Sequence, residues 1–262
     1  MTELYPIPER NKTLAERLAE IFRVTLGYCE SCSKPSFFRS WNENFRETGL
    51  CILCGSKSRQ RQIARVAGTV YRENSEYQCL GKNNLKIYNL ESNHSLHRIM
   101  KDKPGYCSSE YLGPEYYPGQ VVDGVRHEDA HQLSFDDCSF DLVISSDVWE
   151  HLPDPYTAHR EIFRVLKPGG RHIFTIPFYQ ASILDETRSV VNKAGEIEYL
   201  LDPIYHVDPI SDEGSLVYSI FSIETLVKLK HLGFHTTLHK LYSPVRGILG
   251  NNGLVLDALK LY

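Results

Sequence analysis

The chain has 262 residues, of which 42% are hydrophobic and 24% are charged, and its formal net charge is −4. This composition is typical of a soluble globular protein with one large domain, or one medium domain and a small module. The charge gives no overall electrostatic case for nucleic-acid binding, and no apolar run approaches the roughly 18 residues that a membrane-spanning helix needs.

The N-terminal segment mixes acidic, basic and apolar residues and lacks the apolar core of a secretion signal. The cysteine count of seven is odd, which favours a reducing compartment and metal binding over disulfides. We therefore expect a cytoplasmic protein. Within residues 10–27 four apolar residues share one face of a predicted amphipathic helix that ends at Gly27: Leu14, Leu18, Ile21 and Phe22.

Four of the cysteines form two C-x2-C pairs with eighteen residues between the pairs. Two residues between cysteines let both thiolates reach one ion, and two such pairs complete a tetrahedral four-sulfur site. We expect structural zinc, because four sulfur ligands leave no open position for catalysis and the segment has few apolar residues to fold around. The predicted ligands are Cys29, Cys32, Cys51 and Cys54. The predicted N-terminal module, a helix plus a zinc ribbon, covers residues 1–80.

A basic run, "SKSRQRQIAR", follows the second cysteine pair and contains Lys57, Arg59, Arg61 and Arg65. Three interpretations remain open. The run can contact nucleic acid, form a solvated helix face, or meet an acidic or phosphorylated substrate near an active site.

From Leu85 onward, short apolar strands alternate with helices about five times. Strands are predicted within 85–90, 105–112, 121–133, 140–152, 171–178, 235–243 and 253–262, and helices within 94–101, 156–170 and 222–234. This alternation predicts an α/β fold, a doubly wound and mostly parallel sheet with helices on both faces, over residues 81–262. The last two strands have no helix between them, so we expect a hairpin with one antiparallel strand.

Ligands of an open parallel sheet bind at the carboxyl ends of its strands. In this chain polar and acidic residues follow four of the predicted strands. They are Glu91, Ser92, Asn93 and His94; Glu110; Glu128, Asp129 and Ala130; and Ser145, Ser146, Asp147, Trp149, Glu150 and His151.

The segment "FDLVISSDVWEHLPDPYTAHREIFRVLKPGGRHIFTIPF" resembles the fourth strand, following helix and fifth strand of class I S-adenosylmethionine-dependent methyltransferases of type 11. "SIETLVKLKHLGF" resembles the family's late helix, and the resemblance covers roughly residues 85 to 262. The leader resembles that of a bacterial subgroup in which Arg-x-Arg follows the last cysteine pair. The resemblance implies a Rossmann-like sheet and S-adenosylmethionine as cofactor.

The resemblance also implies residue roles. Glu110 would hold both ribose hydroxyls, since two carboxylate oxygens match a vicinal diol. Asp129 would accept from the adenine amino group, with Ala130 beside the ring. Ser146 and Asp147 would line the methionine end of the cofactor.

Four of these residues have a structural alternative. Trp149 would pack on adenine or substrate, or belong to the core. Glu110 can be an exposed strand end, Asp129 a turn residue, and His151 a loop anchor.

The chain departs from the family at its first turn. The family has an acidic residue followed by Gly-x-Gly, whereas this chain has Glu91-Ser92-Asn93-His94-Ser95. We expect Asn93 to take the left-handed position that glycine usually fills. S-adenosylmethionine has no pyrophosphate and needs no amide cradle, so we expect Glu91, Ser92 and Asn93 still to contact it.

A hydroxyl or amine acceptor needs a base, and the candidates are His206, His151, His127 and Asp208. His206 lies in an irregular stretch, residues 180–217, that is predicted to cover the substrate; its alternative is a hydrogen-bonded loop histidine. Three tyrosines can form apolar walls with hydroxyl groups, or merely pack: Tyr179, Tyr205 and Tyr218.

Three functions follow. The first is a methyltransferase acting on a small-molecule or glycan-like acceptor, by O- or N-methylation. The second is a nucleic-acid or protein methyltransferase whose ribbon binds the polymer. The third is a degenerate fold that serves as a binding module. A dinucleotide oxidoreductase is disfavoured, because Gly-x-Gly-x-x-Gly is absent from the first turn.

Overall fold

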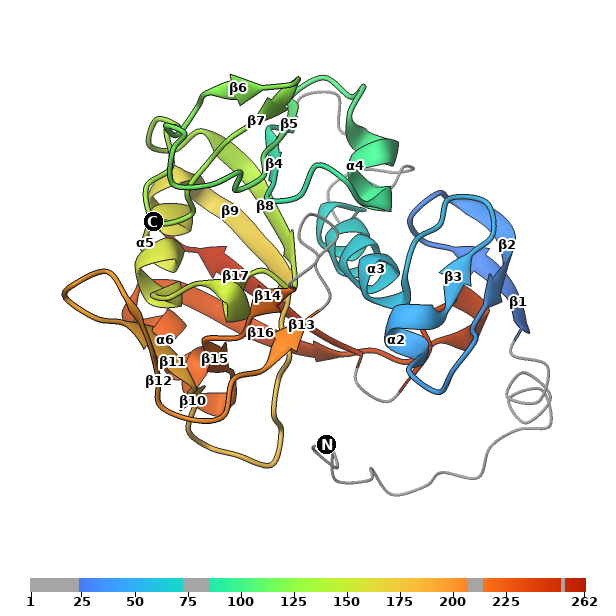
Figure 1. Ribbon diagram of the computed structural model, residues 1–262. Coiled ribbons are helices and arrows are strands. Elements are labelled where there is room, and N and C mark those ends of the chain that lie inside the picture. Colours follow the sequence, from blue (N-terminus) through green and yellow to red (C-terminus); the bar gives the residue numbers. More distant parts are fainter. Residues whose placement is uncertain (1–23, 73–84, 207–213, 251–252) are drawn as a thin grey trace.

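The computed structural model describes residues 24–72, 85–206, 214–250 and 253–262. A small ribbon lies beside a larger part built on a central sheet (Figure 1). The helix predicted over residues 10–27 lies mostly outside the described residues. Its last four positions belong to strand β1 (Val24–Cys29), so the prediction of helix is wrong there.

The central sheet has six strands in the order β16-β17-β9-β8-β4-β5. Strands β5, β4, β8 and β9 are parallel, and β17 is antiparallel to both of its neighbours. This arrangement confirms the doubly wound α/β fold with a closing antiparallel strand. The strands are β4 (Ile87–Asn89), β5 (Tyr106–Ser108), β8 (Phe140–Ser146), β9 (Leu166–Thr175), β16 (Phe234–Lys240) and β17 (Leu254–Lys260).

Helices cover both faces of this sheet. Side chains alternate along a strand, so β8 directs Val143 to one apolar cluster and Leu142 and Ile144 to another. The first cluster includes residues of α5 (Pro155–Val165) and α6 (Ile223–His231), and the second includes residues of α3 (Ser58–Arg72) and α4 (Ser95–Met100).

Helix α3 follows the second cysteine pair in sequence but packs on the sheet. Its Ile63, Ala64 and Ala67 are buried in the same cluster as Leu142 and Val255. The start of α3 therefore has a fixed position at the sheet, and the ribbon before it is held close to the strand ends.

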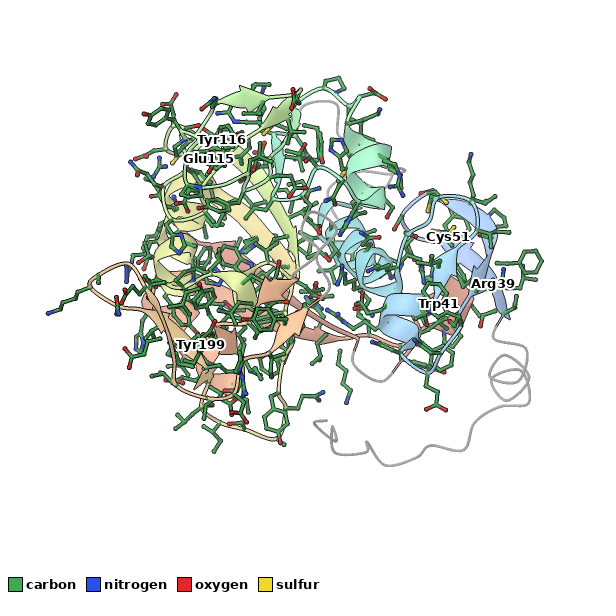
Figure 2. The ribbon with its side chains drawn as sticks, in the orientation of Figure 1. Arg39, Trp41, Cys51, Glu115, Tyr116 and Tyr199 are labelled. Atoms are coloured by element: carbon green, nitrogen blue, oxygen red, sulfur yellow. The ribbon has the colours of Figure 1, made fainter. Side chains whose placement is uncertain are left out.

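The ribbon is a three-stranded antiparallel sheet of β1, β2 (Lys34–Arg39) and β3 (Leu50–Cys51), with the short helix α2 (Phe45–Thr48) before β3. Each cysteine pair sits in a tight turn. The N–H of Ser33 donates to the Cys29 carbonyl, and the N–H of Gly55 donates to the Cys51 carbonyl, both at 2.8 Å. Cys51 and Trp41 lie in this part, away from Tyr199 (Figure 2).

The stretch predicted to be irregular, 180–217, contains short strands instead. They are β10 (Glu186–Thr187), β11 (Ser189–Val191), β12 (Ile197–Tyr199), β13 (Tyr205–His206) and β14 (Ser215–Leu216). β11 pairs with β12 and β13 with β14, while β10 pairs with β15 (Ser219–Ile220). A further hairpin joins β6 (Val121–Val122) to β7 (Val125–Arg126), and two 3-10 turns are η1 (Trp149–His151) and η2 (Pro244–Arg246).

Among the described residues no helix is both long enough and apolar enough to cross a membrane.

Candidate functional site

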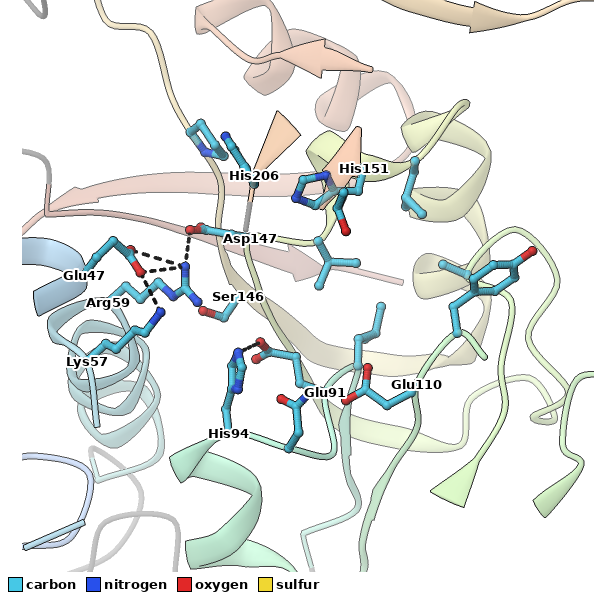
Figure 3. A pocket seen from close by; sticks show the side chains of 18 of the residues that line it. Glu47, Lys57, Arg59, Glu91, His94, Glu110, Ser146, Asp147, His151 and His206 are labelled. Carbon is cyan, nitrogen blue, oxygen red and sulfur yellow. Dashed lines mark hydrogen bonds and ion pairs between the residues drawn. The ribbon is translucent and has the colours of Figure 1, made fainter. Parts of the chain in front are cut away.

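A cavity of about 1200 Å³ opens at the carboxyl ends of the parallel strands. Three parts of the chain line it. They are the segments after the strands, the β13–β14 hairpin, and a wall from the ribbon and the start of α3 (Figure 3). The ribbon wall consists of Trp41, Asn44, Arg46, Glu47, Thr48, Leu50, Lys57 and Arg59.

The turn after β4, residues 91–95, contains no glycine and is held by hydrogen bonds to a carboxylate. The N–H and the hydroxyl of Ser92 both donate to Glu110 Oε1, at 2.7 and 3.1 Å. None of residues 91–95 has a positive φ, so the expectation that Asn93 is left-handed is wrong. The two bonds to Glu110 hold the turn in an ordinary backbone conformation. Glu91, Asn93 and Glu110 line the cavity, whereas Ser92 is not one of its lining residues.

Glu91 is a buried carboxyl group that follows β4 and lines the cavity. Its Oε1 lies 3.3 Å from His94 Nε2, and its Oε2 has no hydrogen-bond partner. Burial raises the pKa of Glu91 to about 8, against the opposing effect of Arg59. Burial also lowers the pKa of His94 to about 4, so the histidine is neutral near pH 7. The unpaired oxygen suits a ligand that carries a positive charge or a donor.

Asp129 both forms a turn and lines the cavity. Its Oδ1 accepts from the N–H and from Nδ1 of His131, both at 2.8 Å. The hydrogen bond from His131 lowers the pKa of Asp129 despite partial burial. Ala130 lies beside it on the cavity wall.

Asp147 links the sheet to the ribbon. It has a left-handed φ of 58°, which is uncommon for a residue with a side chain. Arg46 donates to both of its oxygens at 2.6 and 2.7 Å, and Arg59 donates to Oδ2 at 2.6 Å. Thr175 Oγ1 donates to Oδ1 at 2.8 Å. Although burial opposes it, Arg46 and Arg59 hold the pKa of Asp147 well below its usual range.

Glu47 completes the link from the ribbon side, since it pairs with Arg46, Arg59 and Lys57. Sequence reasoning missed Arg46 and Glu47. The basic run after the cysteines was the only signal for this wall, and nothing local connects Arg46 with Asp147.

Arg61 of the basic run points inward, whereas Arg65 is partly exposed and pairs with Glu30. Arg61 is fully buried, donates from Nε to the Gly247 carbonyl at 2.8 Å, and lies 4.4 Å over the Phe38 ring. Its other nitrogens donate to the carbonyls of Ser56 and Gly49. A solvated face is therefore wrong for Arg61. Of the run, only Lys57 and Arg59 line the cavity.

Trp149 belongs to the core. It has no exposed surface, its Nε1 donates to Ser145 Oγ at 2.8 Å, and its ring stacks on His159 at 4.0 Å. It does not line the cavity, so the core interpretation replaces the expected contact with adenine or substrate. The neighbouring Ser146 is buried but does line the cavity.

His151 and His206 line the other side of the cavity, with rings 5.1 Å apart. Glu150 lies between them and the core, and its burial raises its pKa well above the usual value, with Asp147 adding to the effect.

His127 is buried, and its Nδ1 accepts from the Leu112 N–H at 3.0 Å. Asp208 lies outside the described residues. Tyr205 and Tyr218 line the cavity, and Tyr179 does not.

The four sulfur atoms of Cys29, Cys32, Cys51 and Cys54 lie within 4.8 Å of one another. The Sγ atoms of Cys29 and Cys54 are 3.8 Å apart, a separation that fits two thiolate ligands of one tetrahedral ion. The residues present therefore fit zinc.

The charges of the cavity can be compared with S-adenosylmethionine, which carries a cationic sulfonium and an ammonium group. Six carboxyl groups and three cationic side chains line the cavity. The net charge of these groups stays negative even with Glu91 protonated, which favours a cationic ligand. Glu91 Oε2 is an unpaired acceptor at the end of β4. Both features fit this cofactor.

Residues 108–174 match a family described as a methyltransferase domain. A 2-phytyl-1,4-beta-naphthoquinone methyltransferase of Arabidopsis thaliana is 32% identical over 133 residues, 47% of each chain. A ubiquinone/menaquinone biosynthesis C-methyltransferase of Idiomarina loihiensis is 33% identical over 100 residues, 32% of this chain and 40% of that one. A 27-O-demethylrifamycin SV methyltransferase of Amycolatopsis mediterranei is 42% identical over 57 residues, 21% of each chain. The aligned segments thus span less than half of these relatives.

Two solved structures are similar. A methyltransferase of Mesorhizobium loti has a TM-score of 0.42 and 17% identity, over 73% of this chain and 95% of that one. A Burkholderia thailandensis 1,6-didemethyltoxoflavin-N1-methyltransferase with bound S-adenosylhomocysteine has a TM-score of 0.40 and 15% identity, over 76% and 78%. The fold class rests on the strand order and helix placement of this chain. The sequence comparisons show similarity to a methyltransferase domain over residues 108–174 and partial similarity to named methyltransferases.

Proposed function

We propose that this protein transfers a methyl group from S-adenosylmethionine to a small-molecule or glycan-like acceptor. The observation that carries the proposal is the cavity at the carboxyl ends of the strands, with Glu91, Glu110 and Asp129 along one side within or beside the matched methyltransferase segment. The cofactor supplies an electrophilic methyl group on its sulfonium. The chain supplies binding, orientation and activation of the acceptor.

The proposal assigns a role to each of these residues. Glu110 holds the ribose hydroxyls through its carboxylate while keeping the first turn closed through Ser92. Asp129 and Ala130 face the adenine. Glu91 meets the positive charge of the methionine end, and Asp147 sets the shape of that end through its ion pairs with the ribbon.

The acceptor enters from the side of the β13–β14 hairpin. Tyr205 and Tyr218 provide walls there, and His151 and His206 provide the groups that activate a hydroxyl or amine. A small acceptor agrees with the quinone and rifamycin substrates in the names of the relatives. Cys29, Cys32, Cys51 and Cys54 hold structural zinc, which keeps the ribbon wall in place.

Calorimetric titration with S-adenosylmethionine and S-adenosylhomocysteine tests the proposal. Wild-type protein should bind with micromolar Kd. Glu110→Gln keeps an acceptor for Ser92 but loses the charge, and should weaken binding by about 10- to 100-fold, since a hydrogen bond to a charged group contributes about 1.5–3 kcal/mol. Glu115→Gln is the matched control, because Glu115 is exposed and lies outside the cavity (Figure 2). Folded wild-type protein that shows no binding at millimolar cofactor would reject the proposal in favour of a degenerate fold.

A further inference from the structure

Three side chains converge at the acceptor side of the cavity. Glu150 and His151 come from η1, and His206 comes from β13. One donor atom of each lies within 4.8 Å of the donor atoms of the other two. Figure 3 shows His151 and His206 across the cavity from Glu91 and Glu110.

Glu150 is fully buried, and neither of its carboxylate oxygens has a hydrogen-bond partner within the described chain. Its Oε1 lies 3.7 Å from His151 Nε2 and 3.8 Å from His206 Nδ1. Both distances exceed the range of a hydrogen bond. A buried polar group left unpaired costs roughly 1–3 kcal/mol, and a charged one costs more. This carboxyl group therefore faces two ring nitrogens at ion-pair distance, with no hydrogen bond to satisfy either of its oxygens.

The ring of His151 is oriented by its other nitrogen. Nδ1 lies 2.8 Å from the Leu216 carbonyl, which can only accept, so Nδ1 carries the proton. In the neutral ring the lone pair then lies on Nε2, the nitrogen 3.7 Å from Glu150 Oε1. A backbone carbonyl in this role is the usual outer partner of a metal-binding histidine.

The spacing and donor types suit one cation. Metal–ligand bonds of about 2.0–2.2 Å place neighbouring ligand atoms roughly 3–3.5 Å apart, so the two observed separations need to close only slightly. Two imidazoles and one carboxylate favour Zn²⁺ or another first-row divalent ion such as Mn²⁺. The nearby cations Arg46 and Arg59 are engaged by Asp147 and do not pair with Glu150.

We propose that Glu150, His151 and His206 bind one divalent first-row cation that activates a hydroxyl acceptor. Three protein ligands leave open positions, and both histidines line the cavity where an acceptor oxygen would reach the ion. The ion lowers the pKa of the acceptor hydroxyl, whose proton passes to water. The oxygen electron pair forms the bond to the methyl carbon while the carbon–sulfur bond breaks and its electron pair stays on sulfur. This last step rests on the proposed methyl transfer, whereas binding of the ion does not.

Electron paramagnetic resonance with Mn²⁺ tests the site in the full-length protein, prepared with one equivalent of zinc so that only the four-cysteine site is filled. Mn²⁺ is the probe because thiolates prefer zinc, so the four-cysteine site keeps its own metal. Binding removes the signal of free Mn²⁺, and we expect one ion per chain. Glu150→Gln, which preserves the side-chain shape, and His206→Ala, at a partly exposed position, should each raise the Kd at least tenfold. His235→Ala is the control, since His235 is exposed on β16 outside the cavity.

Absence of Mn²⁺ binding in folded wild-type protein would overturn the site. So would a Kd that neither Glu150→Gln nor His206→Ala changes, with folding verified by thermal melts. Titration of the same samples with S-adenosylmethionine separates the two proposals. Cofactor binding without cation binding rejects only the metal site, and cation binding without cofactor binding rejects only the methyl-transfer function.

Discussion

Hydrogen bonds to the Glu110 side chain hold the turn after β4, which contains no glycine. By accepting twice from Ser92, Glu110 holds the turn after β4 closed, and it still lines the cavity. The same turn leaves Glu91 buried with one unpaired oxygen. The residues after β4 are therefore held in place without a left-handed position.

The raised pKa of Glu91 gives a pH dependence with a definite sign. The folded protein binds this proton more tightly than the unfolded chain, because burial raises the pKa from 4.5 to about 8. The stabilisation is complete below the unfolded value and is lost as pH rises toward 8, by at most about 1.4 kcal/mol per pH unit. Glu91→Gln cannot ionise and should lack this decline.

Urea melts at pH 5, 6.5 and 8 without cofactor measure the decline. His94 is neutral in the folded protein over this window, but in the unfolded chain it takes up a proton near pH 6.5, so it adds an opposite slope between pH 5 and 6.5. The difference between wild type and Glu91→Gln therefore measures the contribution of Glu91. Glu115→Gln, at an exposed position, should follow the wild-type curve. Parallel curves for wild type and Glu91→Gln would contradict the assignment.

The buried position of Trp149 predicts a stability effect without a binding effect. Trp149→Phe removes the N–H that donates to Ser145, although Ser145 keeps its contact with His172. We expect the free energy of unfolding to fall by about 1–3 kcal/mol, as for other lost buried hydrogen bonds. The Kd for S-adenosylmethionine should change less than twofold. A large change in Kd with little change in stability would instead place the indole at the ligand.

At the scale of elements, the ribbon and α3 form one wall of the cavity. Arg46 follows β2, Arg59 lies in the first turn of α3, and both meet Asp147 at the end of β8. Removal of one partner from a buried ion pair commonly costs about 3–5 kcal/mol, because a charge is left unpaired. The fold of the ribbon and the shape of the cavity beside Asp147 are therefore coupled.

Loss of the proposed ribbon zinc should accordingly weaken binding of the proposed cofactor. Cys32→Ser removes one sulfur ligand and should raise the Kd for S-adenosylmethionine at least tenfold, with a lower melting temperature. Cys138→Ser is the matched control, because Cys138 is exposed and far from the ribbon in sequence. Metal analysis of both variants checks the zinc content. Unchanged cofactor affinity in zinc-free Cys32→Ser protein would show that the wall is independent of the metal.

At the scale of the whole molecule, the distribution of charge bears on the kind of acceptor. The cavity has a surplus of carboxylates, and the arginines that suggested a polymer contact pair with Asp147, with backbone carbonyls or with Glu30. Nucleic-acid binding depends on cations that are free to contact phosphates. This arrangement favours a small acceptor.

Gel-shift titration with single-stranded RNA and DNA checks this expectation. At physiological salt we expect no binding tighter than about 100 μM, the weak end of non-specific association. Salt-sensitive binding in the low micromolar range, lost in Lys57→Ala, would return attention to a nucleic-acid acceptor.

The local sequence pattern predicted the fold class and the cysteine cluster of this protein. Alternating apolar strands and amphipathic helices predicted the doubly wound sheet, and the hairpin of β16 and β17 followed from the missing helix between them. The spacing of Cys29, Cys32, Cys51 and Cys54 predicted a cluster that the structure brings together. These features are encoded by residues near one another in sequence.

The contacts between distant residues, and the direction of individual side chains, were decided only by the tertiary structure. Arg46 and Asp147 are 101 positions apart, and no periodicity connects them. Trp149 follows a strand end as its neighbours do, yet the direction of its side chain carries it into the core. Glu150 and His206 meet only because the β13–β14 hairpin folds back over η1. Such contacts depend on how distant elements pack, and packing is a property of the whole chain.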